Sequence, residues 1–142
     1  LVAGARRRAW PGRRARRLGV AGRIHEVGYR ADPRPLYVAA DVLVHPTFHD
    51  PCSLACLEAL AMGVPVITTP ANGVGELMGP RGGIVVEAIG DPSAVAVAVA
   101  VLADPLLRAA TAQDARRVAR RSDETRRLDR VLEICGEVGG RP

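Results

Sequence analysis

The sequence contains no lysine and very few aromatic residues. All 20 basic residues are arginine, a bias typical of GC-rich codon usage, so the formal net charge of +5 is weak support for an anionic partner. The four aromatic residues are Trp10, Tyr29, Tyr37 and Phe48, which leaves Val, Leu, Ile and Ala to form the core. Proteins that bind single-stranded nucleic acid usually stack the bases on aromatic rings. The composition therefore argues against that class.

Cysteines and long apolar runs are also scarce. Three cysteines (Cys52, Cys56 and Cys135) are too few, and odd in number, for a disulfide scaffold, which favours a reducing compartment. The longest apolar run covers the ten residues 94–103, whereas a membrane-spanning helix needs about 20. The sequence also shows no charged n-region and no cleavage site of the kind that a secretory signal has. We therefore expect a cytoplasmic protein.

Two kinds of apolar segment alternate along the chain of 142 residues. Short apolar runs bounded by glycine or proline predict strands, and capped segments with helical periodicity predict helices. The strands are expected at residues 1–3, 24–29, 42–44, 64–69 and 83–87, and the helices at 11–18, 32–40, 53–62, 91–102, from 104 onward and at 122–138. Strands that alternate with helices form a parallel sheet with helices on both faces. The predicted fold class is α/β, with a Rossmann-like sheet.

The segment 94–101 alternates Ala and Val, a period of two that is typical of a strand. Asp91, Pro92 and Ser93 directly before it nevertheless form a helix start. Val95, Val99 and Leu102 would then share one helical face. We therefore predict a helix here.

The carboxyl ends of the strands are the expected ligand-binding edge of such a sheet. Three predicted loops lie there, at residues 27–30, 45–52 and 69–76. Ser53 is a suitable N-cap for the helix that follows the second loop, and the first turn of a helix offers backbone N–H groups to phosphate. The site is therefore expected around residue 53.

Two acids lie on either side of that helix start. Asp50 is in the loop, and Glu58 lies roughly 7 to 8 Å along the helix axis from Ser53. A carboxylate at Glu58 could accept both hydroxyls of a ribose, and Asp50 could accept hydroxyls of a second sugar. Sugar, diphosphate and ribose in this order are the layout of a nucleotide-sugar donor.

The stretch 36–69, which contains both acids, resembles the retaining, family 4 glycosyltransferases of the GT-B fold. Within that family it is most similar to the enzymes that glucosylate the lipopolysaccharide core. The family motif is a Glu, seven residues, a second Glu, and then a Gly-x-Pro-Val strand. Asp50 stands at the first acid, Glu58 at the second, and residues 63–66 at the strand. The resemblance runs from residue 1 to about residue 138.

The resemblance implies a role for each acid and a class of reaction. Asp50, as the first acid, would contact hydroxyls of the donor sugar, and Glu58, as the second, would hold the ribose, which makes both the candidate catalytic residues. The implied function is transfer of a hexose from a nucleotide-diphosphate sugar, such as a UDP- or GDP-hexose, to a glycan or lipid-linked acceptor. The family is metal-independent, so no metal or other cofactor is expected.

Further donor-binding residues are expected at two places. The resemblance implies that backbone amides after the first acid hold the sugar and the diphosphate, and that the loop at 27–29 flanks the base. His45 is expected to end a strand at the donor cleft, or else to be a polar residue with its hydrogen bonds satisfied inside the protein. The candidate donor-binding residues besides the two acids are therefore Val27, Gly28, Tyr29, His45, Cys52, Ser53 and Leu54.

The chain departs from the family pattern in two respects. Asp50 is one methylene shorter than the usual Glu. A complete enzyme has two Rossmann-like domains, and residues 1–142 are expected to be part of the C-terminal, donor-binding one, with 104–138 as its C-terminal helices. The N-terminal acceptor domain and the first βα unit, which supplies an Arg/Lys pair for the diphosphate, are expected to be missing. This chain alone is therefore expected to bind its donor weakly and to be inactive.

Two alternative functions remain. The segment Arg6–Arg17 holds seven arginines in twelve residues and could bind nucleic acid or an anionic membrane, although a solvated helix face that reflects codon bias is the favoured interpretation. Of these partners nucleic acid is the less favoured, and peripheral contact with the inner face of the cell membrane is the more favoured. The chain could instead be an inactive, truncated remnant.

His45, His49, Cys52 and Cys56 are residue types that bind zinc at short spacings. Prolines stiffen their loop, and Cys56 is expected on the buried face of a helix, so a metal site is not favoured. Cys52 lies near a helix N-terminus, where the pKa of a thiol falls, but it has no evident base.

Asn72, Gly73 and Glu76 follow the strand at 64–69 at the same sheet edge. They either line the sugar pocket or form a turn followed by a surface acid. The sequence leaves both interpretations open.

Overall fold

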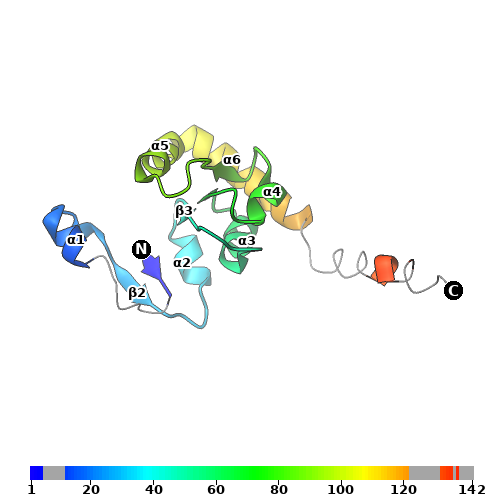
Figure 1. The fold of residues 1–142 in the computed structure, drawn as a ribbon, viewed down its shortest axis with the longest axis horizontal. Coiled ribbons are helices and arrows are strands. Elements are labelled where there is room, and N and C mark those ends of the chain that lie inside the picture. The colour runs from blue at the N-terminus through cyan, green and yellow to red at the C-terminus, as the bar shows by residue number, and fades with distance from the viewer. Residues whose placement is uncertain (5–11, 122–131, 136, 138–142) are drawn as a thin grey trace. The chain divides into compact units, whose positions relative to one another are not determined.

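The computed structural model describes residues 1–4, 12–121, 132–135 and 137 (Figure 1). By their internal contacts the residues divide into two units, 1–40 and 41–142, which are described separately. Half of the segment Arg6–Arg17 lies outside the described residues. So does most of the helix expected over 122–138, of which residues 132–135 are helical.

The first unit contains a small parallel sheet. Its strands are β1 and β2, in which Val2 pairs with Glu26 and Ala3 with Gly28. Asp32 starts the last helix by accepting the Arg34 N–H at 3.1 Å, and the hydrogen bond from the Arg34 side chain lowers the pKa of its carboxyl group. The elements of this unit are β1 (Val2–Ala3), α1 (Gly12–Arg17), the 3-10 helix η1 (Ala21–Arg23), β2 (Glu26–Gly28) and α2 (Arg34–Val38).

The second unit is built on a three-stranded parallel sheet in the order β3-β4-β5. The strands are β3 (Leu43–His45), β4 (Val66–Thr68) and β5 (Gly83–Val85), and all three end at the same edge because the register is even. Every residue of β4, the central strand, is buried, as expected for a strand with neighbours on both sides and helices on both faces.

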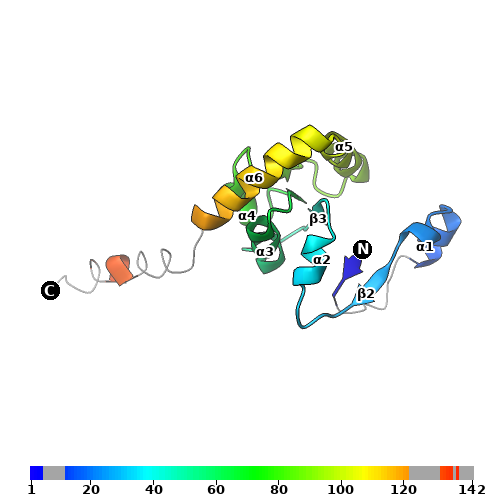
Figure 2. The ribbon, with the colours of Figure 1, turned by 180° about the vertical axis from the view of Figure 1, so that it is seen from behind.

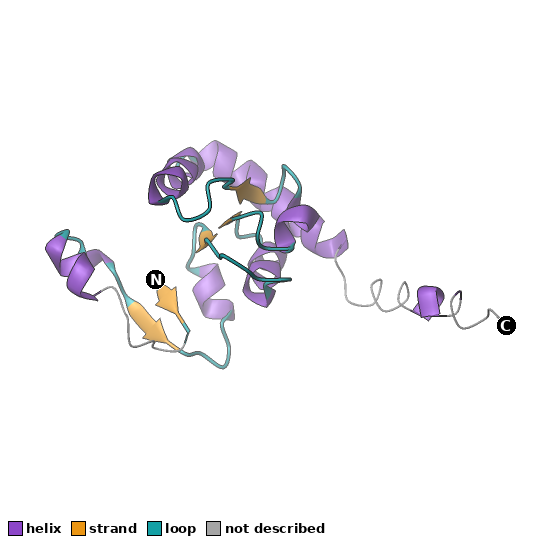
Figure 3. Ribbon diagram, in the orientation of Figure 1, coloured by secondary structure: helices purple, strands orange, loops and turns teal. Residues whose placement is uncertain are grey.

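Four helices cover this sheet (Figures 2 and 3). They are α3 (Leu54–Met62), α4 (Val74–Met78), α5 (Pro92–Leu102) and α6 (Pro105–Arg121). Ile67 of β4 packs in a cluster with Ala98 and Leu102 of α5. Beside Gly82, the residue before β5, lie the side chains of Leu60, Met78 and Val118, from α3, α4 and α6. The predicted α/β fold with a parallel sheet and helices on both faces is confirmed, although four of the five strands are shorter than predicted and β3 is shifted by one residue.

Helix α5 confirms the helical prediction for the alternating Ala and Val segment. The Asp91 carboxylate caps it by accepting the Ser93 N–H at 2.8 Å, and Pro92 occupies the first turn. Its packed face contains Val95, Ala98 and Leu102. Val99, predicted on this face, lies at its margin and is 42% exposed.

A sharp corner separates α5 from α6. Arg108 donates to the carbonyl groups of Leu102 and Ala103 at 3.0 and 3.1 Å, and so satisfies the C-terminal end of α5. The Asp104 carboxylate accepts the Leu106 N–H and begins α6. Among the described residues no single helix has the length and composition of a membrane span, and α5 and α6 reach them only as a pair bent by 97°.

Helix α6 also fastens the C-terminal end of α3. Gly63 ends α3 with a φ of +76°, which favours glycine. The Arg116 guanidinium lies over this residue and donates to the Met62 carbonyl oxygen at 3.3 Å. A Cβ atom on residue 63 would overlap that guanidinium, which is the end of a flexible side chain and can move aside, so the positive φ is what favours glycine there.

Candidate functional site

The carboxyl ends of β3, β4 and β5 form one edge of the sheet, from which three loops leave. The loop after β3 is tied to the loop after β4 by main-chain bonds, in which the Asp50 N–H donates to Ala71 at 3.0 Å and the Gly73 N–H donates to Asp50 at 3.1 Å. The Thr69 hydroxyl adds a bond to the Thr47 carbonyl oxygen at 2.6 Å. The candidate site is therefore built on a braced loop.

The Asp50 carboxylate lies between the end of β3 and the start of α3. Its Oδ1 accepts the Cys52 N–H at 3.2 Å, and its Oδ2 lies 3.2 Å from the Nε2 atom of His45. Both side chains are partly buried, with 28% of Asp50 and 34% of His45 exposed. Two predicted site residues are thus brought into direct contact. Each carboxylate oxygen keeps room for a second hydrogen bond.

Ser53 caps α3 as the sequence predicts. Its buried hydroxyl oxygen accepts the Cys56 N–H at 3.4 Å. Of the three amides expected to hold the diphosphate, those of Cys52 and Ser53 already donate to side chains of this protein. The Leu54 and Ala55 N–H groups have no acceptor within the described residues. These two donors are what the helix start offers to an anion.

The exposed face of α3 continues from this start. Leu54 and Glu58 lie one turn apart on the same face, and both are exposed. A ligand on the Leu54 and Ala55 N–H groups would therefore have the Glu58 carboxylate beyond it along the helix. This is the arrangement expected from the sequence, and the ribose role of Glu58 stays a prediction.

Asn72 has a role that the sequence analysis missed. The residue is completely buried, its Oδ1 accepts the Ser53 and Val74 N–H groups, and its Nδ2 donates to the Thr68 hydroxyl at 3.0 Å. Nδ2 also contacts the Cys56 sulfur at 3.4 Å. Asn72 therefore braces the start of α3 from inside and does not line a sugar pocket. The sequence does carry a signal for this role, which is the group of small polar residues at the ends of these elements. When such polar atoms are buried, they need hydrogen-bond partners inside the protein.

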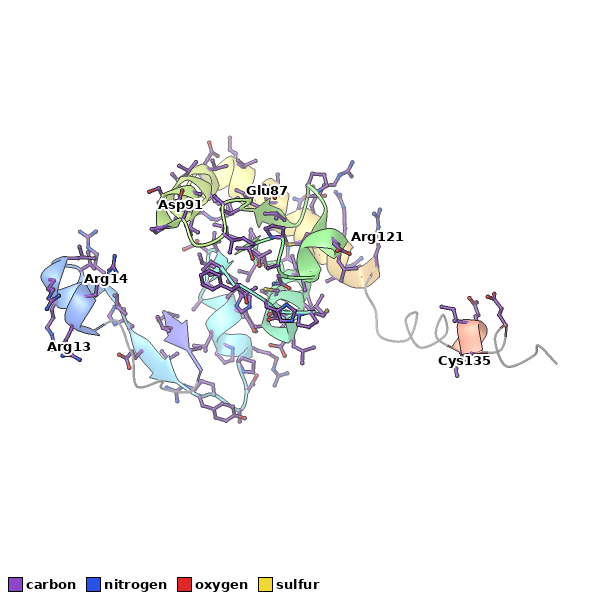
Figure 4. All side chains as sticks on the ribbon, in the orientation of Figure 1. Arg13, Arg14, Glu87, Asp91, Arg121 and Cys135 are labelled. Atoms are coloured by element: carbon purple, nitrogen blue, oxygen red, sulfur yellow. The ribbon has the colours of Figure 1, made fainter. Side chains whose placement is uncertain are left out.

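Gly73 and Glu76 fit the second interpretation of this segment. A Cβ atom on residue 73 would overlap the Pro51 carbonyl oxygen, so glycine permits the close approach of the two loops. Glu76 is an exposed acid on α4. Two further acids, Glu87 and Asp91, lie on the third loop of the same edge (Figure 4). Of these, Asp91 is engaged as the cap of α5.

Val27, Gly28 and Tyr29, the residues expected to flank the base, belong to the first unit. Gly28 ends β2 with a φ of +66°, and the Tyr29 side chain is 78% exposed. An exposed aromatic ring can stack on a base. The base-binding role of this loop stays a prediction.

The cysteines of the site lack the surroundings of a nucleophile or a metal centre. Cys56 is buried, as predicted, and burial raises the pKa of its thiol. Since the thiolate is the reactive form, Cys56 is inert at neutral pH. Within the described part of the chain, no group of three or more His, Cys, Asp or Glu side chains could hold a metal ion.

Loss of the Ser53 cap has a defined expected cost. In Ser53→Ala the Cys56 N–H loses its acceptor inside the protein, and the free energy of unfolding should fall by about 1 kcal/mol. Chemical denaturation followed by circular dichroism measures this. Ser93→Ala is the matched control, because Ser93 is an exposed serine in the first turn of α5. Equal effects of the two substitutions would contradict the assignment of the cap.

Comparison with known proteins connects this geometry to a family. A family model described as glycosyl transferases group 1 matches residues 1–104. The lipopolysaccharide core biosynthesis glycosyltransferase LpsE of Rhizobium meliloti (strain 1021) is 36% identical over 110 residues, which cover 76% of this chain and 30% of LpsE. The lipopolysaccharide glucosyltransferase WaaG of Escherichia coli (strain K12) is 32% identical over 111 residues, covering 77% of this chain and 30% of WaaG.

Solved structures show the same likeness. The crystal structure of WaaG, a glycosyltransferase involved in lipopolysaccharide biosynthesis, matches with a TM-score of 0.71 at 30% identity, over 83% of this chain and 32% of that one. Anabaena Alr3699/HepE in complex with UDP matches with a TM-score of 0.77 at 26% identity, over 88% of this chain and 35% of that one. The chain spans about a third of the length of these relatives.

Proposed function

Because this chain belongs to the group 1 glycosyl transferases, we propose that it is the donor-binding part of a hexosyltransferase that uses a nucleotide-diphosphate sugar. Residues 1–142 are then part of the C-terminal domain of a GT-B enzyme, and residues 104–138 are its C-terminal helices. In such an enzyme the N-terminal domain would hold a glycan or lipid-linked acceptor. The likeness to HepE, which was solved with UDP bound, supports a uridine or similar nucleotide in the donor.

The single observation that carries this proposal is the polarity of the site along α3. N–H donors of Leu54 and Ala55 lie at the helix start, with the Asp50 carboxylate before them and the Glu58 carboxylate after them. Donors suit a diphosphate, and carboxylates suit the hydroxyls of a hexose and a ribose. In a nucleotide-sugar the hexose, the diphosphate and the ribose follow one another in this same order.

The same arrangement assigns work in the reaction. Negative charge develops on the leaving diphosphate as the bond to the hexose breaks, and the N–H groups and dipole of α3 stabilise it. Asp50 and Glu58 orient the two sugars on either side. No step requires a metal ion or another cofactor, in keeping with the family resemblance. The acceptor arrives from the other domain, with retention of configuration at the transferred sugar.

We also propose a cytoplasmic enzyme that works at the inner face of the membrane. The two curated relatives carry lipopolysaccharide in their names, which supports a lipid-linked acceptor. Peripheral contact through arginines with anionic lipid would keep the enzyme near such an acceptor.

A second candidate function rests on α1. Arg13, Arg14, Arg16 and Arg17 are all exposed on this short helix, and Figure 4 labels the first two. By its charge alone, such a helix suits an anionic surface. A membrane is favoured over a nucleic acid as that surface. Binding of this kind would weaken steeply with salt and would not depend on Glu58.

Titration with nucleotides separates these functions. UDP, GDP and ADP are added to the ¹⁵N-labelled chain, and we expect amide shifts at Leu54, Ala55 and Glu58 with millimolar affinity, because a helix start alone binds phosphate weakly. Glu58→Gln should weaken the best nucleotide about tenfold, since a charged acceptor of hydrogen bonds is lost. Glu76→Gln, an exposed acid on α4, is the control.

The opposite outcome is equally well defined. Shifts confined to Arg13–Arg17 and reproduced by inorganic phosphate would favour the basic module. The donor-binding proposal would then be wrong.

A further inference from the structure

His45 is held in place from three sides at the carboxyl end of β3. Its main chain pairs with Thr68 in the sheet, and its carbonyl oxygen accepts the Thr68 hydroxyl at 2.9 Å. Its side chain meets Asp50 through Nε2 at 3.2 Å. The imidazole ring therefore has a fixed position beside the first acid of the proposed donor site.

The free ring nitrogen of His45 faces solvent. Within the described part of the chain, every buried side-chain nitrogen or oxygen has a hydrogen-bond partner. The Nδ1 atom of His45 has none, so it is not buried. A nitrogen that is positioned by the fold and open to solvent is available to a ligand.

Asp50 determines which ring nitrogen carries the proton. A carboxylate only accepts hydrogen bonds, so the contact at 3.2 Å requires the proton on Nε2. Nδ1 of the neutral ring then presents a lone pair. Nδ1 lies on the side of the ring away from Asp50, and both Nδ1 and the remaining lone pairs of Asp50 accept hydrogen bonds.

We propose that His45 Nδ1 accepts a hydrogen bond from a hydroxyl of the hexose in the nucleotide-sugar, with Asp50 as its positioning residue in addition to its own sugar contact. The assignment rests on the proposed function and makes it more specific. Such acceptors suit hydroxyl groups and disfavour the diphosphate of a nucleotide-sugar, which has no proton to donate at neutral pH. The Leu54 and Ala55 N–H groups have the opposite preference. His45 therefore marks the sugar end of the site.

The tautomer of His45 gives a test that needs no ligand. Long-range ¹H–¹⁵N correlation of the ¹⁵N-histidine-labelled chain, which distinguishes the two tautomers, should show the Nε2–H form. Asp50→Asn should invert it. If the new side-chain amide keeps its oxygen on the Cys52 N–H, its NH₂ group faces Nε2 and can only donate, so the proton moves to Nδ1. The assignment would be overturned if the wild-type ring carries its proton on Nδ1, or if Asp50→Asn has the same tautomer as the wild type.

Ligand binding tests the hydroxyl contact itself. UDP and UDP-glucose are titrated separately, and the ratio of their affinities reports the contribution of the hexose. His45→Phe keeps a planar ring without nitrogen and should reduce this ratio about 3- to 10-fold, the usual net value of one hydrogen bond. Glu58→Gln is the matched control, since loss of a ribose contact weakens both ligands and keeps the ratio.

The two proposals fail in different ways. If the wild-type chain binds none of UDP, GDP, ADP and UDP-glucose, the proposed function is wrong, and the hydroxyl contact with it. If both bind and His45→Phe keeps the wild-type ratio, the donor site stands and the role of His45 is wrong.

Discussion

Gly83→Ala is expected to prevent stable folding of the second unit. Gly83 is the first residue of β5, and a Cβ atom there would overlap the Val66 carbonyl oxygen and lie 2.7 Å from the Val66 carbonyl carbon. These are main-chain atoms of the buried central strand, which cannot move aside without loss of its pairing to β5. Overpacking of this kind costs more than about 3 kcal/mol. The variant should therefore lack a cooperative thermal transition or melt far below the wild type.

The neighbouring glycine is the control for this prediction. At Gly82 the nearest atoms to an added Cβ belong to the side chains of Leu60, Met78 and Val118, at 3.2 to 3.4 Å. Side-chain ends can shift by a few tenths of an ångström, so Gly82→Ala should cost about 1 kcal/mol. Thermal unfolding followed by circular dichroism compares the two variants directly. Similar melting temperatures for both would contradict the packing of β5 against β4.

Asn72→Ala should produce the second-largest loss of stability. The substitution removes the acceptor of the Ser53 and Val74 N–H groups and the donor to the Thr68 hydroxyl, all in a completely buried position. Each buried polar group left without a partner costs about 1 to 3 kcal/mol. The free energy of unfolding should therefore fall by about 3 kcal/mol or more, as measured by urea denaturation.

Gln113→Ala is the matched control for Asn72→Ala. It removes an exposed side-chain amide on α6 and should change the free energy of unfolding by less than about 0.5 kcal/mol. Because Asn72 also holds the Ser53 N–H, the first turn of α3 should exchange its amide hydrogens faster in Asn72→Ala. Unchanged exchange at Ser53 and Cys56, whose N–H groups have acceptors in the wild type, would show that Asn72 does not brace the site.

Local signals in the sequence were sufficient to predict most elements of the second unit. The Asp91-Pro92-Ser93 start outweighed the strand-like alternation of 94–101, because a capped start fixes the helical backbone and Ala is compatible with it. Ser53 and Gly63 marked both ends of α3 correctly. Strand ends were less predictable, since they depend on which neighbouring strand supplies hydrogen bonds.

The candidate site was predictable in its location and less so in its contacts. Asp50 and Ser53 lie in the loop after β3 and Glu58 lies on α3, as the sequence predicts, while their roles in donor binding stay predictions. The contact between His45 and Asp50, and the burial of Asn72, arise from two loops that meet across the sheet edge. Partners nineteen residues apart, such as Ser53 and Asn72, leave no periodic trace in a single sequence.

Helix α3 is a continuous helix whose two ends have different contacts. Its nine residues span about 14 Å, from the Leu54 and Ala55 N–H groups to Gly63. At that C-terminal end the Arg116 side chain of α6 donates a hydrogen bond to the Met62 carbonyl oxygen. A helix moves as one unit when one of its ends is displaced, whereas a loop would bend and absorb the displacement. A displacement of α6 would therefore be carried along α3 to the Leu54 and Ala55 N–H groups of the candidate site.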